Sequence, residues 1–290
     1  MSVGPAAQGT SERIVRWLRC PDCHGPLTVS GAEITCASSG FRGSLRDDVA
    51  VMMPEGPASF FDDKFHVMRH GRENKGEWDF CYARQTEMLT ASLRPGMLVL
   101  DVGCGPVLPY AKPGGVSVVG LEPSFQSIRA NTQVDLRVYG SAYSIPMAGA
   151  SADVVVCLYA IHHMVGATVR ETVANVDRAF REFGRVLKPG GTLLIFEMTP
   201  LPYFQLAQAL YWNPFKRILG GKLDMHFYSA GSMERLGQGA LPRGSALEKI
   251  AFQTSPFSMI APVFSLPRLK VPRMAYPLDA RLYKWRMPSA

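Results

Sequence analysis

The chain has 290 residues, of which 47% are hydrophobic and 19% are charged, and its formal net charge is +7. These values are typical of a globular protein and exclude an intrinsically disordered chain. No apolar run of about 18 or more residues is free of charge and proline, so the sequence predicts no membrane span. The N-terminus lacks a basic region followed by an apolar core, and the six cysteines are not spread as a disulfide framework. Together these features predict a cytoplasmic protein.

The N-terminal segment, residues 1–54, predicts a small β-rich module. Three cysteines with metal-ligand spacing lie in it, two as a CxxC knuckle and one after the alternating stretch LTVSGAEITC: Cys20, Cys23 and Cys36. This pattern resembles half a zinc ribbon, but Ser39 and Gly40 stand where a second pair of ligands is expected. Structural zinc normally needs four Cys or His ligands. The sequence therefore favours a degenerate ribbon held by packing over bound zinc, with closure of the site by a distant residue as the alternative.

Residues 55–93 predict a helical connector, and residues 94–290 predict an α/β domain. Five apolar strands recur in this domain, with a helix over residues 172–187 that ends at the turn KPGG: 97–103, 116–122, 135–142, 152–160 and 192–198. Uninterrupted apolar strands of this kind indicate a mostly parallel sheet that is covered on both faces. The sequence therefore predicts a doubly wound, Rossmann-like fold.

The C-terminal part is longer than such a core requires. We expect an insertion at about 199–250 that covers the substrate, including an aromatic-rich amphipathic helix over residues 201–219. Its aromatic side chains either line an acceptor pocket or pack against the sheet, and the sequence does not decide between these. From Arg268 to the end, basic residues far outnumber acids. Such a tail either attracts an anionic partner such as nucleic acid or serves solubility.

The loop after the first α/β strand carries the clearest functional signal. In VLDVGCGP, a buried strand runs into Gly103 and Gly105, which permit a sharp turn and close approach of a ligand. Glu122 ends the next strand, where a carboxylate can accept hydrogen bonds from both ribose hydroxyls of a nucleoside. Asp101 suits a ligand with an ammonium group better than a pyrophosphate, and Leu108 stands where a dinucleotide motif needs a small residue. The spacing therefore favours S-adenosylmethionine over NAD.

The chain resembles class I S-adenosylmethionine-dependent methyltransferases in four ordered blocks: VLDVGCGP, VVGLEPS, GSAYSIPMAGASADVVVCLYAIHHM and FGRVLKPGGTLLIFE. The resemblance implies an enzyme in which Asp101, Gly103 and Gly105 line the methionine part of the cofactor and Glu122 holds the ribose. It also implies that five further residues line the cofactor, three at the adenine edge or beside it and two at the end of the fourth strand: Pro123, Ser141 with Ala142, and Leu158 with Tyr159. The N-terminal module resembles the zinc module of ribosomal RNA guanine-N1 methyltransferases.

Histidines follow the fourth strand, at the rim where the methyl group would meet its acceptor. His162 or His163 is a candidate general base, because a histidine can take a proton from a hydroxyl or an amine near neutral pH. The alternative is that one packs in the wall and the other is solvated. His226 is a further candidate pocket histidine.

We therefore expect methyl transfer from S-adenosylmethionine to a small-molecule O, N or C acceptor, in secondary metabolism. One alternative is a ribosomal RNA base methyltransferase, which the basic tail and the ribbon-like module favour. Another is a non-catalytic partner protein that binds S-adenosylmethionine. The sequence does not decide the oligomeric state.

Overall fold

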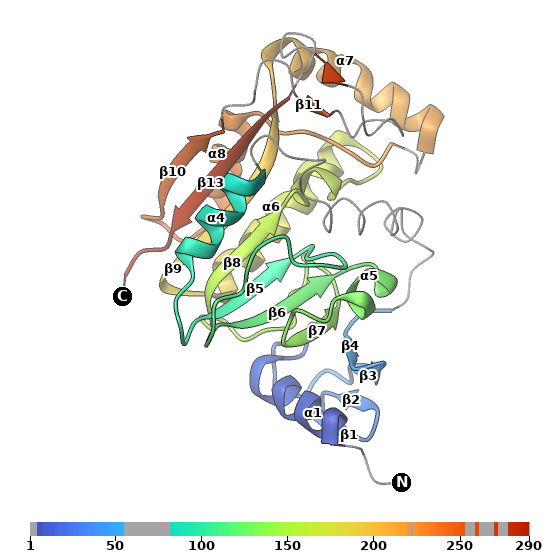
Figure 1. The fold of residues 1–290 in the computed structure, drawn as a ribbon. Coiled ribbons are helices and arrows are strands. Elements are labelled where there is room, and N and C mark those ends of the chain that lie inside the picture. The colour runs from blue at the N-terminus through green and yellow to red at the C-terminus, as the bar shows by residue number, and fades with distance from the viewer. Residues whose placement is uncertain are drawn as a thin grey trace.

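The computed structural model describes residues 5–54, 82–220, 223–252, 259–260, 270–271 and 278–289. Its centre is a set of five parallel strands (Figure 1): β5 (Leu98–Val102), β6 (Ser117–Glu122), β7 (Leu136–Tyr139), β8 (Ala152–Leu158) and β9 (Leu187–Pro200). Nearly every residue of β5, β6 and β8 is buried, as strands covered on both faces require. The predicted Rossmann-like α/β fold is confirmed.

The order of these strands places the functional edge of the sheet. It runs β7-β6-β5-β8-β9, so the chain adds strands on one side of β5 and then on the other. The reversal lies between β5 and β8, and ligands of doubly wound sheets bind outside the carboxyl ends of the strands at such a point. The loops after β5 and β8 therefore face the predicted cofactor crevice.

The C-terminal strands complete the other edge of the sheet. β13 (Leu278–Arg286) pairs antiparallel with β9, and β10 (Ala246–Ala251) pairs antiparallel with β13. Part of the basic C-terminal segment is thus sheet, and Lys284 of β13 pairs with Glu248 of β10 at 2.9 Å. A further short pair is formed by β11 (Met259–Ile260) and β12 (Lys270–Val271).

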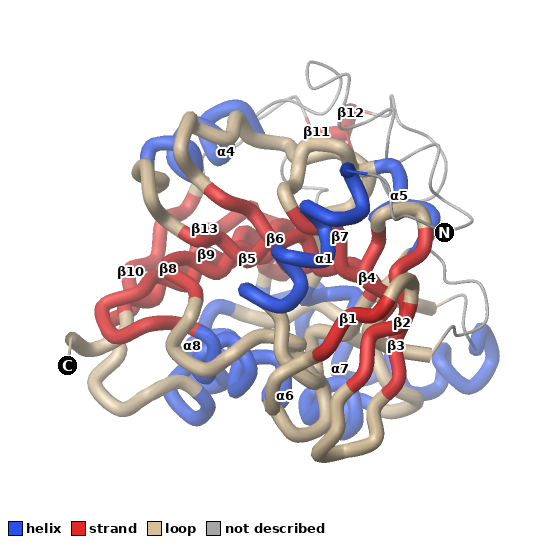
Figure 2. The backbone as a smooth tube through the Cα atoms, turned by 90° about the horizontal axis from the view of Figure 1, so that it is seen from below, coloured by secondary structure: helices blue, strands red, loops and turns tan. Residues whose placement is uncertain are grey.

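Helices cover both faces of the sheet. One face carries α6 (Val169–Val186) and α8 (Ala230–Ala240), and the other carries α4 (Tyr82–Ser92) and α5 (Phe125–Ala130) (Figure 2). A 3₁₀ turn, η2 (Ile161–His163), follows β8, and α7 (Pro202–Leu219) follows β9. Segment 106–115, which contains three prolines, forms no helix. No helix in the described ranges is both long and apolar enough to cross a membrane.

Two boundaries differ from the predicted ones. The predicted turn KPGG lies within β9, where the pairing with β8 shifts register and Gly190 has a φ of +73°. The irregular start of this strand accommodates the proline and the glycines. Of the predicted connector 55–93, α4 is helical, and residues 55–81 lie outside the described part.

The N-terminal module is continuous with the sheet of the α/β domain. It begins with α1 (Pro5–Trp17), followed by an antiparallel meander: β1 (Thr28–Ser30), β2 (Glu33–Thr35), β3 (Arg42–Arg46) and β4 (Val49–Val51). β4 pairs parallel with β7, so the meander extends one edge of an eleven-stranded sheet (Figure 2). The sequence indicated a separate module and gave no sign of this shared edge.

Two glycines of α8 test how closely this helix packs on the sheet. A Cβ at Gly237 would overlap the buried ring of Trp285, whereas a Cβ at Gly239 would meet nothing within 4 Å. We expect Gly237→Ala to lower the free energy of unfolding by about 1–3 kcal/mol through overpacking. Gly239→Ala, the matched control, should raise it by about 0.5–1 kcal/mol, because alanine is the better helix former. Urea unfolding measures both, and equal effects would contradict this packing.

Candidate active site

The glycine loop after β5 has a backbone that side chains would disturb. Gly103 has a φ of +70° and Gly105 a φ of +61°, in the left-handed region that favours glycine. A Cβ at Gly103 would lie 2.7 Å from Cβ of Ala160, on the loop after β8. The glycine therefore lets the two loops approach each other across the topological switch point.

Glu122 joins this loop to the end of β6. Its buried carboxylate accepts hydrogen bonds from the backbone N–H of Gly105 at Oε2 and of Ser124 at Oε1, both at 3.0 Å. Each carboxylate oxygen can accept more than one hydrogen bond. Glu122 thus holds the loop in place and retains the capacity to accept hydrogen bonds from ribose hydroxyls.

Asp101 is the second buried carboxylate of the crevice, at the end of β5. Its Oδ2 accepts a hydrogen bond of 2.8 Å from the hydroxyl of Tyr110. The sequence carried no signal for this partner, because Tyr110 lies in the irregular segment that replaces a first helix. Two buried acids and a glycine-lined loop fit a ligand with hydroxyl groups and a positively charged amine.

The loop predicted to hold adenine is braced by the N-terminal module. Ser141 accepts a hydrogen bond from the backbone N–H of Tyr143 at 3.1 Å, so its hydroxyl stabilises its own turn. Farther along the loop, Ser144 donates to the carbonyl of Pro21, and the backbone N–H of Arg19 donates to the loop carbonyl of residue 146 at 2.9 Å. The cysteine knuckle therefore packs directly on this loop.

The other predicted cofactor residues lie around the same crevice. Pro123 is exposed directly after β6, and Ala142 is half-buried beside Ser141. Leu158 is buried in the core at the end of β8. Tyr159 has a φ of +54° and donates its hydroxyl to Oε1 of Gln85 in α4 at 2.7 Å. Its ring therefore connects the loop after β8 to a helix that precedes the core.

His162 forms a pair with a buried carboxylate that the sequence analysis missed. Its Nδ1 lies 2.6 Å from Oε1 of Glu197, which is 0% exposed on β9, and its backbone N–H donates to Oε2 of the same carboxylate. The carboxylate makes Nδ1 the protonated nitrogen and leaves Nε2 as an acceptor. Among the described residues no hydrogen bond to Nε2 is formed. An acid at the end of the apolar strand LLIFE was the available signal for Glu197.

His163 has a different environment, although the two rings lie 4.1 Å apart. Its Nδ1 lies 3.2 Å from the backbone carbonyl of Asp224 and 3.6 Å from the carboxylate of that residue. Burial lowers the pKa of His163, and His162 lowers it further, against the opposing effect of Asp224. The side chain of His163 is thus neutral near pH 7.

His226 lies behind His162, and its backbone N–H donates to the carbonyl of His162 at 2.8 Å. The amide oxygen of Gln208 accepts from the backbone N–H of Phe227, and its nitrogen donates to the carbonyl of Phe227. These two bonds fix the orientation of the Gln208 amide, whose nitrogen also donates to Nε2 of His226 at 3.3 Å. The ring is therefore neutral and carries its proton on Nδ1, which has no hydrogen-bond partner among the described residues. Burial lowers the pKa of His226 to about 4.

This shift predicts a pH-dependent contribution to stability. The unfolded chain takes up a proton at His226 as the pH falls through its ordinary pKa of 6.5, whereas the folded protein does so only near 4. The unfolded state binds more protons in this window, so the free energy of unfolding falls between pH 6.5 and 4, by up to about 3 kcal/mol. Urea unfolding of the wild type and of His226→Gln at pH 7 and 5 measures this: the loss should be smaller in the variant, and equal losses would contradict it.

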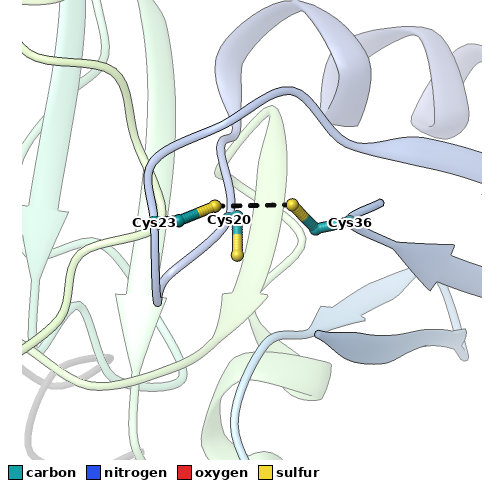
Figure 3. Close-up of side chains that lie close together, drawn as sticks. All are labelled: Cys20, Cys23 and Cys36. Carbon is teal, nitrogen blue, oxygen red and sulfur yellow. Dashed lines mark hydrogen bonds between the residues drawn. The ribbon is translucent and has the colours of Figure 1, made fainter. Parts of the chain in front are cut away.

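The three cysteines of the knuckle lie together (Figure 3), with ligand atoms within 4.8 Å of one another. Sγ of Cys23 and Cys36 are 3.5 Å apart, and Sγ of Cys20 is 3.1 Å from Oγ of Ser39. Hydrogen bonds from the hydroxyl and backbone N–H of Ser39 lower the pKa of Cys36 to about 6. The hydroxyl of Ser39 thus lies beside the three thiols. Three thiols and a hydroxyl fall short of the usual Cys and His set of structural zinc.

Comparisons with known proteins find similarity to methyltransferases. Residues 100–195 match a family model described as a methyltransferase domain. The chain is 36% identical over 126 residues to the 27-O-demethylrifamycin SV methyltransferase of Amycolatopsis mediterranei (strain S699), a match that covers 38% of this chain and 42% of that protein. It is 30% identical over 176 residues to the demethylmenaquinone methyltransferase of Thermobifida fusca (strain YX), over 57% of this chain and 67% of that protein.

A solved structure shares the fold. It is a complex between the Haloferax volcanii Trm112 methyltransferase activator and a methyltransferase, and it aligns with a TM-score of 0.52 and 15% identity over 81% of this chain and 100% of that chain.

The strand order defines a Rossmann-like α/β protein, in which ligands bind outside the carboxyl ends of the strands at the switch point. The relatives make the class specific: the chain belongs to the S-adenosylmethionine-dependent methyltransferases. The family predicted from the sequence is thereby confirmed, together with S-adenosylmethionine as the cofactor of that family.

Proposed function

We propose that this protein transfers the methyl group of S-adenosylmethionine to an O, N or C atom of a small molecule, in secondary metabolism. The observation that carries the proposal is the glycine loop at the switch point, which lies between the buried carboxylates Asp101 and Glu122. The two curated relatives are named for small-molecule acceptors, a rifamycin and a menaquinone precursor.

His162 acts as the general base in this proposal. When bound, the cofactor supplies a methyl group activated on a sulfonium. For an O–H or N–H acceptor, Nε2 of His162 would take the acceptor proton as the methyl group passes to the acceptor lone pair, and the electron pair of the broken carbon–sulfur bond would remain on the sulfur. Glu197 keeps the ring in the required tautomer and stabilises the imidazolium that forms, in the way a carboxylate supports a catalytic histidine elsewhere. Alignment of acceptor and methyl group supplies the rest of the rate enhancement.

For the N-terminal module, we propose a degenerate zinc ribbon that stabilises the adenine loop. Its supports are the contacts of Arg19 and Pro21 with that loop and the pairing of β4 with β7. Metal analysis of the purified protein tests this. Substoichiometric zinc is expected. A content of about one zinc per chain would show that the module binds zinc and would overturn the proposal of a degenerate ribbon.

The experiment that tests the function uses S-adenosylmethionine with a radiolabelled methyl group. The protein and the labelled cofactor are incubated with an extract of a strain that lacks the gene, and products are separated by size. Label in the small-molecule fraction is expected and locates the acceptor. Label in RNA would overturn the proposal in favour of an RNA base methyltransferase. Cofactor binding without any labelled product would favour a non-catalytic partner protein.

A further inference from the structure

Helix α7 exposes large apolar side chains and is joined to the domain by hydrogen-bonding side chains. Large apolar side chains on its outer stripe are mostly solvent-accessible, with exposed fractions of 63% for Leu206, 61% for Leu210 and 78% for Ile218. These positions lie on one side of the helix, because residues three and four apart share a face. A surface helix of a globular protein normally shows the opposite arrangement.

The inner face of α7 is attached to the domain by polar side chains. The amide of Gln208 bonds the backbone of Phe227, and Oδ1 of Asn213 accepts from the backbone N–H of Val169 at 3.2 Å. Trp212, 4% exposed, donates its indole N–H to the carbonyl of Met225 at 2.9 Å. A groove of about 540 Å³ lies on this same side, between α6, α7 and α8. The orientation of the helix is therefore set by hydrogen bonds, and its apolar stripe faces away from the core.

The exposed apolar side chains are concentrated on this one helix. Of the nine exposed large hydrophobic residues in the described part of the chain, all but Val15 and Val173 belong to α7. Single exposed apolar residues are normal on a protein surface, but a contiguous group marks an interaction surface. α7 also lies at the end of the molecule opposite the N-terminal module (Figure 1).

The charge and the aromatic residues of α7 indicate what covers the stripe. The sequence has no Asp or Glu between Met198 and Leu223. Arg217 in the last turn of α7 is exposed, whereas the ammonium of Lys216 donates to the carbonyl of Leu223 at 2.6 Å. Aromatic side chains accompany the aliphatic ones on the exposed face: Tyr203, Tyr211 and Phe215. Apolar and aromatic residues with an exposed basic residue and no acids are typical of a helix that lies in the interface of an anionic membrane.

We propose that α7 docks this protein on the surface of an anionic phospholipid membrane. A second copy of the chain suits the surface less well, because symmetric pairing of two such helices brings no acidic side chain of α7 to the basic ones. Phe227, which Gln208 holds, stacks on His162 with ring centroids 5.2 Å apart. Docking by α7 would therefore place the membrane surface on the outer side of this helix, with the helix and Phe227 between it and the ring of His162.

Binding to vesicles tests the proposal without any substrate. The full-length protein is sedimented with unilamellar vesicles of equal parts phosphatidylglycerol and phosphatidylcholine, or of phosphatidylcholine alone. We expect binding to the anionic vesicles and much weaker binding to the neutral ones. The double variant Leu206→Gln and Leu210→Gln should bind the anionic vesicles at least about tenfold more weakly, because two leucines no longer enter the interface. Arg217→Gln should weaken binding about fivefold, the change that corresponds to about 1 kcal/mol for one basic side chain.

Val15→Gln is the matched control, because it makes the same kind of change at an exposed apolar residue of α1. It should bind like the wild type, and circular dichroism verifies that all variants are folded. Equal binding of the double variant and the wild type, or equal binding to both vesicle types, overturns the proposal. A wild type that binds no vesicles also overturns the proposal. Light scattering distinguishes one such case, in which the wild type is a dimer and the double variant is a monomer. In that last case a second copy covers the stripe.

Discussion

Replacing His162 by glutamine should lower kcat by about 10²–10⁴-fold and leave cofactor affinity nearly unchanged. The loss is that of a general base placed beside the acceptor. Glutamine keeps a polar side chain next to Glu197, so the buried carboxylate is not stranded beside an apolar group. The measurement is single-turnover methyl transfer to the acceptor from the labelling experiment, with calorimetry for cofactor binding.

His163→Gln is the control for this prediction, because it makes the same substitution one residue away, at a ring that faces Asp224. It should change kcat by less than about tenfold. Glu197→Gln should lower kcat while KM changes little, since the carboxylate acts through the orientation and charge of His162. If His162→Gln keeps its kcat within about threefold of the wild type, alignment alone accounts for the rate, and His162 is no base.

Replacing Glu122 by glutamine should weaken cofactor binding by about 1–3 kcal/mol, which is roughly 5- to 150-fold in Kd. The amide has one acceptor oxygen where the carboxylate has two, and the backbone N–H groups of Gly105 and Ser124 both donate to this residue. The variant therefore leaves a buried N–H without its acceptor and offers the ribose hydroxyls fewer lone pairs. Titration calorimetry with S-adenosylmethionine measures the change.

Because Glu122 also holds the glycine loop, we expect its variant to unfold at a lower temperature than the wild type. Binding should therefore be measured well below both unfolding temperatures. Glu87→Gln, at an exposed position of α4, is the matched control and should bind like the wild type. An unchanged Kd for Glu122→Gln would show that the ribose is held elsewhere.

The part of the crevice that the sequence predicted is built from residues close together in the chain. Asp101, Gly103 and Gly105 form one strand-to-loop connection, and Glu122 ends the strand that follows. Their spacing is set by strand length and by the tight turn that glycine permits, and both are local properties. The alternation of apolar strands and helices likewise predicted the parallel sheet and its order of elements.

The tertiary structure decided the partners of these residues. His162 and Glu197 are 35 residues apart and meet only because β8 and β9 pair in a particular register. The pairing of β4 with β7, which brings the cysteine knuckle to the adenine loop, depends in the same way on which strand edge remains open.

Helix α7 shows the same division most clearly. The sequence predicted an amphipathic, aromatic-rich helix and left open which side it presents to the sheet. Hydrogen bonds that join Gln208, Trp212 and Asn213 to distant segments fix which side of the helix faces the domain. The sequence by itself determined the fold and the family, and it predicted the glycine-loop part of the proposed cofactor site, because these follow from local pattern. Only the tertiary structure decided the pairing of His162 with Glu197, the attachment of the N-terminal module to the sheet and the outward face of α7. Each of these depends on contacts between residues far apart in the chain.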